Sequence, residues 1–166
     1  MASQNIRLLW FRFGLTCYAM AYALALPMAF GIQGSYSSYH AVAPIIFPLA
    51  TTIISLGLWL HRSKEWEIPA IALVVVSLFN MFEWPMIHNT AAMAFFMSAT
   101  AIMIRDKRYG LYGIKSLLFY PLLIMIEDGG LFWFEAIQIV LVAAYHMRRV
   151  LHLIELNKSK NKNKGE

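Results

Sequence analysis

The sequence predicts an all-α protein: a polytopic transmembrane helical bundle of about six helices, with the N and C termini cytoplasmic. Apolar residues make up 60% of the 166-residue chain and charged residues only 14%, and the mean hydropathy is +0.57. A soluble domain of this length normally carries far more charge on its surface. The charges here are clustered between long apolar runs. The ten-residue polar and apolar alternation of membrane β-strands is absent.

Six apolar runs are candidate membrane spans, because a helix needs about 20 such residues to cross the hydrocarbon core. They are Leu8–Ala29, Ala41–Leu60, Ile68–Phe82, Thr90–Ile104, Leu111–Ile126 and Leu131–Ile154. The third, fourth and fifth runs are short, so we expect their ends to lie in the membrane interface. Residues 1–156 are expected to form the bundle, and residues 157–166 a disordered, basic cytoplasmic tail. The tail has no aromatic residue and no amphipathic spacing, so no nucleic-acid partner is predicted.

The orientation follows from the basic residues. The connections Phe30–His40, Glu83–Asn89 and Glu127–Gly130 contain no Lys or Arg, so all 14 basic residues fall on the other side. The positive-inside rule makes that side cytoplasmic. Tryptophans lie near predicted helix ends on both sides, as in an interfacial aromatic belt: Trp10, Trp59, Trp66, Trp84 and Trp133.

A group of polar residues maps to the outer half, where no basic residue can neutralise the carboxylates. Ionisable groups at membrane depth are costly and usually face a bundle interior or a water-filled cavity. We take His88, Glu83 and Glu135 as candidate catalytic residues, since histidine and carboxylate can act as acid and base on a lipid ester or amide. A second set is taken as candidate substrate-binding residues: His40, Asn89 and Asp128.

Other interpretations of the same residues stay open. His40, His88 and a carboxylate have the chemistry of a zinc site, and His61 with His146, or His40 with His88, has that of a b-type haem ligand pair. No metal or cofactor is assigned. A structural role for each residue is the alternative to all of these. Two alternatives to lipid handling also stay open for the whole protein. One is a non-catalytic accessory subunit of a larger membrane complex. The other is a small transporter or channel, whose acidic outer cluster would attract cations.

Two segments resemble the Frag-type/DRAM family of six-span membrane proteins, which is related to GPI-anchor lipid-remodelling factors. The last span, from Phe134 to His146, places a His eleven residues after Glu135, and His88 opens a run of small residues and phenylalanines that resembles the fourth helix of that family. The resemblance implies lipid remodelling, lipid organisation or membrane trafficking, and carries over His88, Glu135 and His146. The first outer loop lacks a Pro-rich pattern, and Val142 replaces an Asn, so the sequence departs from the GPI-linked members there.

From these observations we expect lipid handling or remodelling near the outer leaflet. The expected partners are membrane lipids, other membrane subunits or further copies of this chain. Both a bacterial plasma membrane and a eukaryotic endomembrane fit the short loops.

Overall fold

The fold comes from a computed structural model that describes residues 6–60, 64–121 and 130–162, with side chains up to Ser159. These residues form helices joined by turns and short loops, and no strand is found among them, which confirms the all-α class. In chain order the elements are α1 (Ile6–Phe30), η1 (Tyr36–Ser38), α2 (Tyr39–Val42), α3 (Ile46–Trp59), η2 (Lys64–Trp66), α4 (Glu67–Leu78), α5 (Pro85–Arg105), α6 (Gly110–Leu118) and α8 (Gly130–Lys162).

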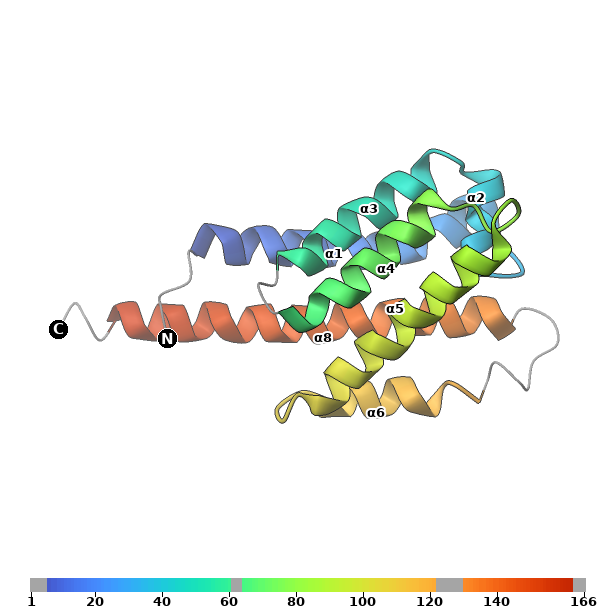
Figure 1. The fold of residues 1–166 in the computed structure, drawn as a ribbon. Coiled ribbons are helices and arrows are strands. Elements are labelled where there is room, and N and C mark those ends of the chain that lie inside the picture. The colour runs from blue at the N-terminus through green and yellow to red at the C-terminus, as the bar shows by residue number, and fades with distance from the viewer. Residues whose placement is uncertain (1–5, 61–63, 122–129, 163–166) are drawn as a thin grey trace.

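Two long antiparallel helices, α1 and α8, lie side by side, and the shorter helices pack across them (Figure 1). Each of the pairs α3–α4, α4–α5 and α5–α6 packs as neighbours in sequence, and α3 also contacts α1 while α5 and α6 contact α8. The first residues of α1 and α4 and the last residues of α3, α5 and α8 therefore lie at the same end of the bundle (Figure 1). We call this the basic end, because Arg7, Lys64, Arg105, Arg148 and Lys158 belong to it.

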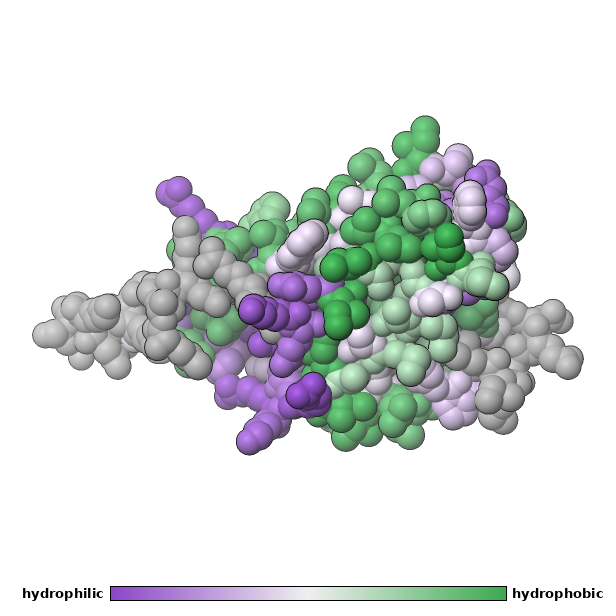
Figure 2. Space-filling model, viewed as in Figure 1, coloured by the Kyte–Doolittle hydropathy of each residue, from purple (hydrophilic) through white to green (hydrophobic). Residues whose placement is uncertain are grey.

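Among the described residues, three helices are long and apolar enough to cross a membrane: α1, α5 and the Gly130–Ser159 part of α8. Many of their apolar side chains are exposed, and an apolar surface covers the middle of the visible face (Figure 2). These features support an integral membrane protein. A helix is present at each of the six predicted spans, but α3, α4 and α6 have only 14, 12 and 9 residues. Six crossings and cytoplasmic termini stay predictions.

The helix ends differ from the predicted spans for local reasons. The predicted Ala41–Leu60 run is split into α2 and α3, because Pro44 disfavours a helical conformation at Ala43, whose φ and ψ are −137° and 60°. Helix α5 starts at Pro85, ahead of the predicted Thr90, since proline suits the first turn of a helix. Gly31, with a φ of 73°, ends α1 in the left-handed conformation that favours glycine.

The boundary between the bundle and the C-terminal tail also differs from the prediction. Helix α8 continues through Lys162, into the segment predicted as a disordered tail, and residues 163–166 lie outside the described residues. Four tryptophans are about half exposed near helix ends, as an interfacial belt requires, namely Trp10, Trp59, Trp84 and Trp133. Trp66 is instead fully buried against Tyr145 and His146.

Candidate functional site: a central cavity and its polar rim

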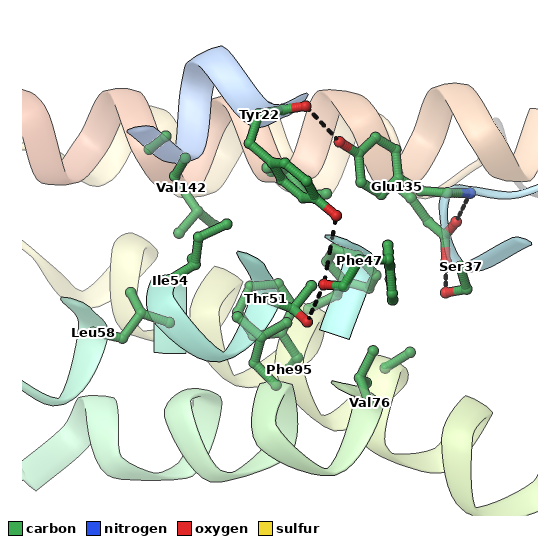
Figure 3. A pocket seen from close by; sticks show the side chains of 17 residues that line it. Tyr22, Ser37, Phe47, Thr51, Ile54, Leu58, Val76, Phe95, Glu135 and Val142 are labelled. Atoms are coloured by element: carbon green, nitrogen blue, oxygen red, sulfur yellow. Dashed lines mark hydrogen bonds between the residues drawn. The ribbon is translucent and has the colours of Figure 1, made fainter. Parts of the chain in front are cut away.

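Five helices and η1 surround a cavity of about 70 Å³ in the middle of the bundle (Figure 3). Most of its wall is apolar, with Phe47 and Ile54 from α3 and Phe95 and Phe96 from α5. Its polar lining comes from Tyr22, Tyr36, Ser37, Thr51 and Glu135. Because a buried water molecule needs roughly 10–15 Å³ of cavity volume on this scale, the cavity accommodates only a few non-hydrogen atoms. It therefore fits the end of a chain and excludes a whole lipid in this conformation.

Among the described residues, Glu135 is the one carboxylate on the cavity wall. It lies in the second turn of α8, is 6% exposed, and accepts hydrogen bonds from the backbone N–H of Tyr36 at 2.5 Å and from the hydroxyl of Ser37 at 3.4 Å (Figure 3). A carboxylate that is removed from water needs such donors, since an unsatisfied buried charge is very costly. Glu135 thereby holds η1 against the start of α8 and closes one side of the cavity.

The tyrosines of η1 and α1 extend this polar rim. The Tyr36 hydroxyl donates to the Tyr22 carbonyl at 3.2 Å, and the Tyr22 hydroxyl donates to the Phe47 carbonyl at 3.5 Å. Burial, together with the nearby Tyr39 and Glu135, raises the pKa of Tyr36 above its ordinary value. Tyr36 thus stays a neutral hydrogen-bond donor.

His40 and His88 meet at the end of α4. The Nε2 atom of His40 lies 3.1 Å from the Val76 carbonyl oxygen, and the Nδ1 atom of His88 lies 2.7 Å from the Phe79 carbonyl oxygen. Both rings must carry a proton on that nitrogen to donate to a carbonyl. The ring centroids are 5.8 Å apart at an interplanar angle of 77°. The pair supplies donors to carbonyls that the last turn of a helix leaves without a partner.

The predicted site residues thus separate into groups. His40 joins His88, and Glu135 joins η1, while Glu83 and Asn89 are exposed. No hydrogen bond links His88 to Glu83 or Glu135, all three of which the structure describes. Asp128 and His61 lie outside the described residues. Within the described ranges, no group of three or more His, Cys, Asp and Glu side chains is placed to hold a metal ion.

His146 lies in the other half of the bundle, far along α8 from Glu135. Its ring packs edge-on against Trp66, with centroids 4.2 Å apart. It borders a second cavity of about 30 Å³ together with Arg12 and Thr16. That volume holds only about two water molecules on the same scale, so the space at His146 does not fit a haem.

Sequence reasoning missed Tyr22, Tyr36 and Ser37, which complete the rim around Glu135. The only signal for them was the uncharged run of serines and tyrosines from Ser35 to Tyr39, which contrasts with a solvated loop. It also missed Arg12, which is 2% exposed and donates to the Leu60 carbonyl at the end of α3. No protein-family model, no curated protein and no solved structure matches this chain.

Proposed function

We propose that this chain is a multi-pass membrane protein that handles lipids by taking the end of one lipid chain into the central cavity. The observation that carries the proposal is the contrast between the apolar wall and the single polar rim at Glu135, Tyr36 and Ser37. A hydrocarbon chain fits the wall through apolar burial. A hydroxyl, amine or protonated group of an amphiphile fits the hydrogen-bond acceptors of the Glu135 carboxylate.

The small volume of the cavity sets how the lipid would be held. At about 70 Å³, the cavity takes only the terminal part of a chain, and the remainder lies between helices or in the bilayer. Lipid remodelling near the outer leaflet, and the resemblance of the α5 and α8 segments to the Frag-type/DRAM family, are parts of the same proposal. So are catalytic roles for His88, Glu83 and Glu135, which require a substrate to bridge side chains that do not touch one another.

The test is photo-crosslinking of the purified full-length protein. The probe is a phosphatidylcholine whose acyl chain carries a diazirine near its end, and the labelled residues are mapped by mass spectrometry. We expect labels on cavity residues of α3 and α5. Ala92→Phe places a ring in the cavity, and Ala94→Phe places the same ring on the exposed side of α5. The first variant should lose at least tenfold of the cavity label, and the second should keep it.

A second cavity-filling variant, Ile139→Phe, covers the case in which Ala92→Phe does not fold. Folding of each variant is checked by its melting temperature in detergent. Labels spread over lipid-facing residues, or equal cavity labelling in the two alanine variants, would refute the binding of a chain in this cavity.

A non-catalytic subunit of a larger membrane complex is the second candidate function. It is favoured by an open apolar groove of about 590 Å³ between α4 and α5, lined by residues such as Ile71, Val75 and Ile87. A helix of a partner subunit or of a second copy would bury such a surface. Crosslinks from a cysteine placed at Ile71 to another protein chain in native membranes, together with the absence of lipid label in the central cavity, would favour this candidate.

A further inference from the structure

A patch of basic side chains lies at the basic end of the bundle, where α5 ends and α6 begins, next to the C-terminal half of α8. We define this basic patch as Arg105, Lys107, Arg108, Arg149 and His152. Arg105 is the last residue of α5, Lys107 and Arg108 form the turn to α6, and Arg149 and His152 are on α8. Hydrophilic side chains gather at this place on the visible face (Figure 2).

The patch is held by a chain of hydrogen bonds between the turn and α8. The Asp106 carboxylate accepts the backbone N–H groups of Arg108 and Tyr109 at 2.9 and 3.2 Å, and the Tyr145 hydroxyl at 2.8 Å. Arg149 donates to the Tyr145 hydroxyl at 3.0 Å. The turn that carries Lys107 and Arg108 is therefore fixed against α8.

Arg108 is positioned a second time. Its guanidinium donates to the Nε2 atom of His152 on α8. The guanidinium of Arg149 lies 6.0 Å from the centre of the Tyr145 ring. Two arginines on different elements are thus presented in defined positions, which lowers the side-chain entropy that a ligand would otherwise cost them.

The basic patch has a net positive charge, because one carboxylate does not neutralise its several cationic groups. Asp106 is the carboxylate at its centre. Burial alone would raise the pKa of Asp106, but the hydrogen bonds from Tyr145, Arg108 and Tyr109 and the charge of Arg149 together lower it. Asp106 is therefore ionised, yet its oxygens are directed at the turn and at Tyr145. The cationic groups of Arg105, Lys107 and Arg108 remain exposed.

We propose that the basic patch binds the phosphate of an anionic phospholipid headgroup at the membrane surface where α5 and α8 leave the bilayer. The candidate span of α5 ends at Arg105, so the patch is at headgroup level. Exposed apolar side chains flank it, namely Ile104, Leu111 and Ile114, and these contact acyl chains. Guanidinium groups match phosphate oxygens with paired hydrogen bonds, and basic clusters beside a membrane helix attract anionic lipids.

The test compares binding of two lipids with the same acyl chains, phosphatidylglycerol and phosphatidylcholine, by native mass spectrometry of the full-length protein in detergent. We expect tighter binding of phosphatidylglycerol by tenfold or more. The Lys107→Ala/Arg108→Ala double variant should lose about fivefold in phosphatidylglycerol affinity for each charge removed, or roughly 25-fold in total. Its phosphatidylcholine binding should not change.

The matched control is Lys64→Ala/Lys158→Ala, which removes the same number of charges elsewhere at the basic end. It should retain the preference for phosphatidylglycerol. Equal losses of phosphatidylglycerol affinity in the two double variants would show that the net positive charge of the basic end attracts the lipid without a localised site. Equal binding of the two lipids by the wild type would also overturn the proposal. Full competition by inorganic phosphate at equal concentration would overturn the assignment to a lipid. Lys107 takes no part in the hydrogen bonds that fix the turn, so Lys107→Ala alone serves if the double variant does not fold.

Discussion

Replacing Gly113 by alanine tests how closely α5 and α6 approach each other. A Cβ atom at residue 113 would lie 2.4 Å from the backbone nitrogen of Ile104, 2.6 Å from its Cγ1 atom and 2.8 Å from the carbonyl carbon of Met103. Two of these three atoms belong to the backbone of α5, so no change of rotamer relieves the contact. The helices must instead move apart, which also disturbs the buried hydrogen bonds that Ser116 makes with Thr100 and Gln138.

The size of the effect follows from two opposing terms. Overpacking of a well-packed core typically costs about 1–3 kcal/mol, and more where the backbone must shift. Alanine in place of glycine inside a helix raises the free energy of unfolding by about 1 kcal/mol at most. Since the Gly113 contact is with backbone, we expect the upper part of the overpacking range and a net loss of about 2 kcal/mol in the free energy of unfolding.

The other glycines provide a graded series for the same substitution. A Cβ at Gly14 meets nothing within 4 Å, and one at Gly110 lies 3.1 Å from the Ile104 carbonyl oxygen. We therefore expect Gly14→Ala to be neutral or stabilising, Gly110→Ala to be mildly destabilising, and Gly113→Ala to be the most destabilising. The assay is reversible unfolding in mixed detergent micelles with increasing dodecyl sulfate. A Gly113→Ala protein as stable as Gly14→Ala would refute the close approach of α5 and α6.

Three further outcomes are expected. Gln138→Leu should lower the free energy of unfolding by about 1–2 kcal/mol in the same assay, because buried Gln138 accepts from the Ser116 hydroxyl and donates to the Ser116 carbonyl. The control Asn89→Leu, on the exposed face of α5, should lower it little. The folded-state pKa of Asp106 is lowered, so ionised Asp106 stabilises the fold above the ordinary carboxyl pKa, and this stabilisation is lost as the pH falls through the lowered value. The difference in unfolding free energy between wild type and Asp106→Asn should therefore narrow from about pH 7 to about pH 3. A difference that stays constant with pH would contradict the Asp106 contacts. In a Cys17→Ala background, an impermeant thiol reagent should label Gly34→Cys from outside the cell and leave Lys64→Cys unlabelled, and the reverse pattern would invert the predicted orientation.

The helical architecture could be predicted because apolar length and charge clustering are long-range averages that single residues do not alter. Each predicted run contains a helix, and described basic residues such as Arg7, Lys64 and Arg105 belong to helix ends at the same end of the bundle. Helix ends could not be predicted as well, because they depend on local chemistry. Pro44 splits one run and Pro85 starts another helix early.

The site was predictable only in part, since sequence shows which polar residues enter the membrane region but not what they face. Glu135 was predicted as a site residue and does border the cavity. His88 was grouped with Glu83 because both map to the predicted outer half, yet His88 is buried within α5 whereas Glu83, in the turn before α5, is exposed. The contribution of η1 could not be foreseen, because nothing in a short loop sequence indicates that it folds back against α8.

The short helices explain why so many polar side chains are buried in this bundle. A helix that ends in apolar surroundings leaves carbonyl groups that water cannot reach, and other parts of the protein must satisfy them. Arg12 donates to the carbonyl at the end of α3, and His40 and His88 donate to carbonyls at the end of α4.

Glu135 differs from these residues in a way that bears on function. It is an acceptor, so it cannot complete a helix C-terminus, and the N–H that it takes belongs to a loop. A serine or an amide could have supplied an acceptor at that position without burying an ionisable group, which is the costlier choice. The carboxylate also lines the cavity, whereas neither His40 nor His88 does. Glu135 therefore combines a structural contact with η1 and access to the central cavity, which makes it the first residue to test for ligand binding.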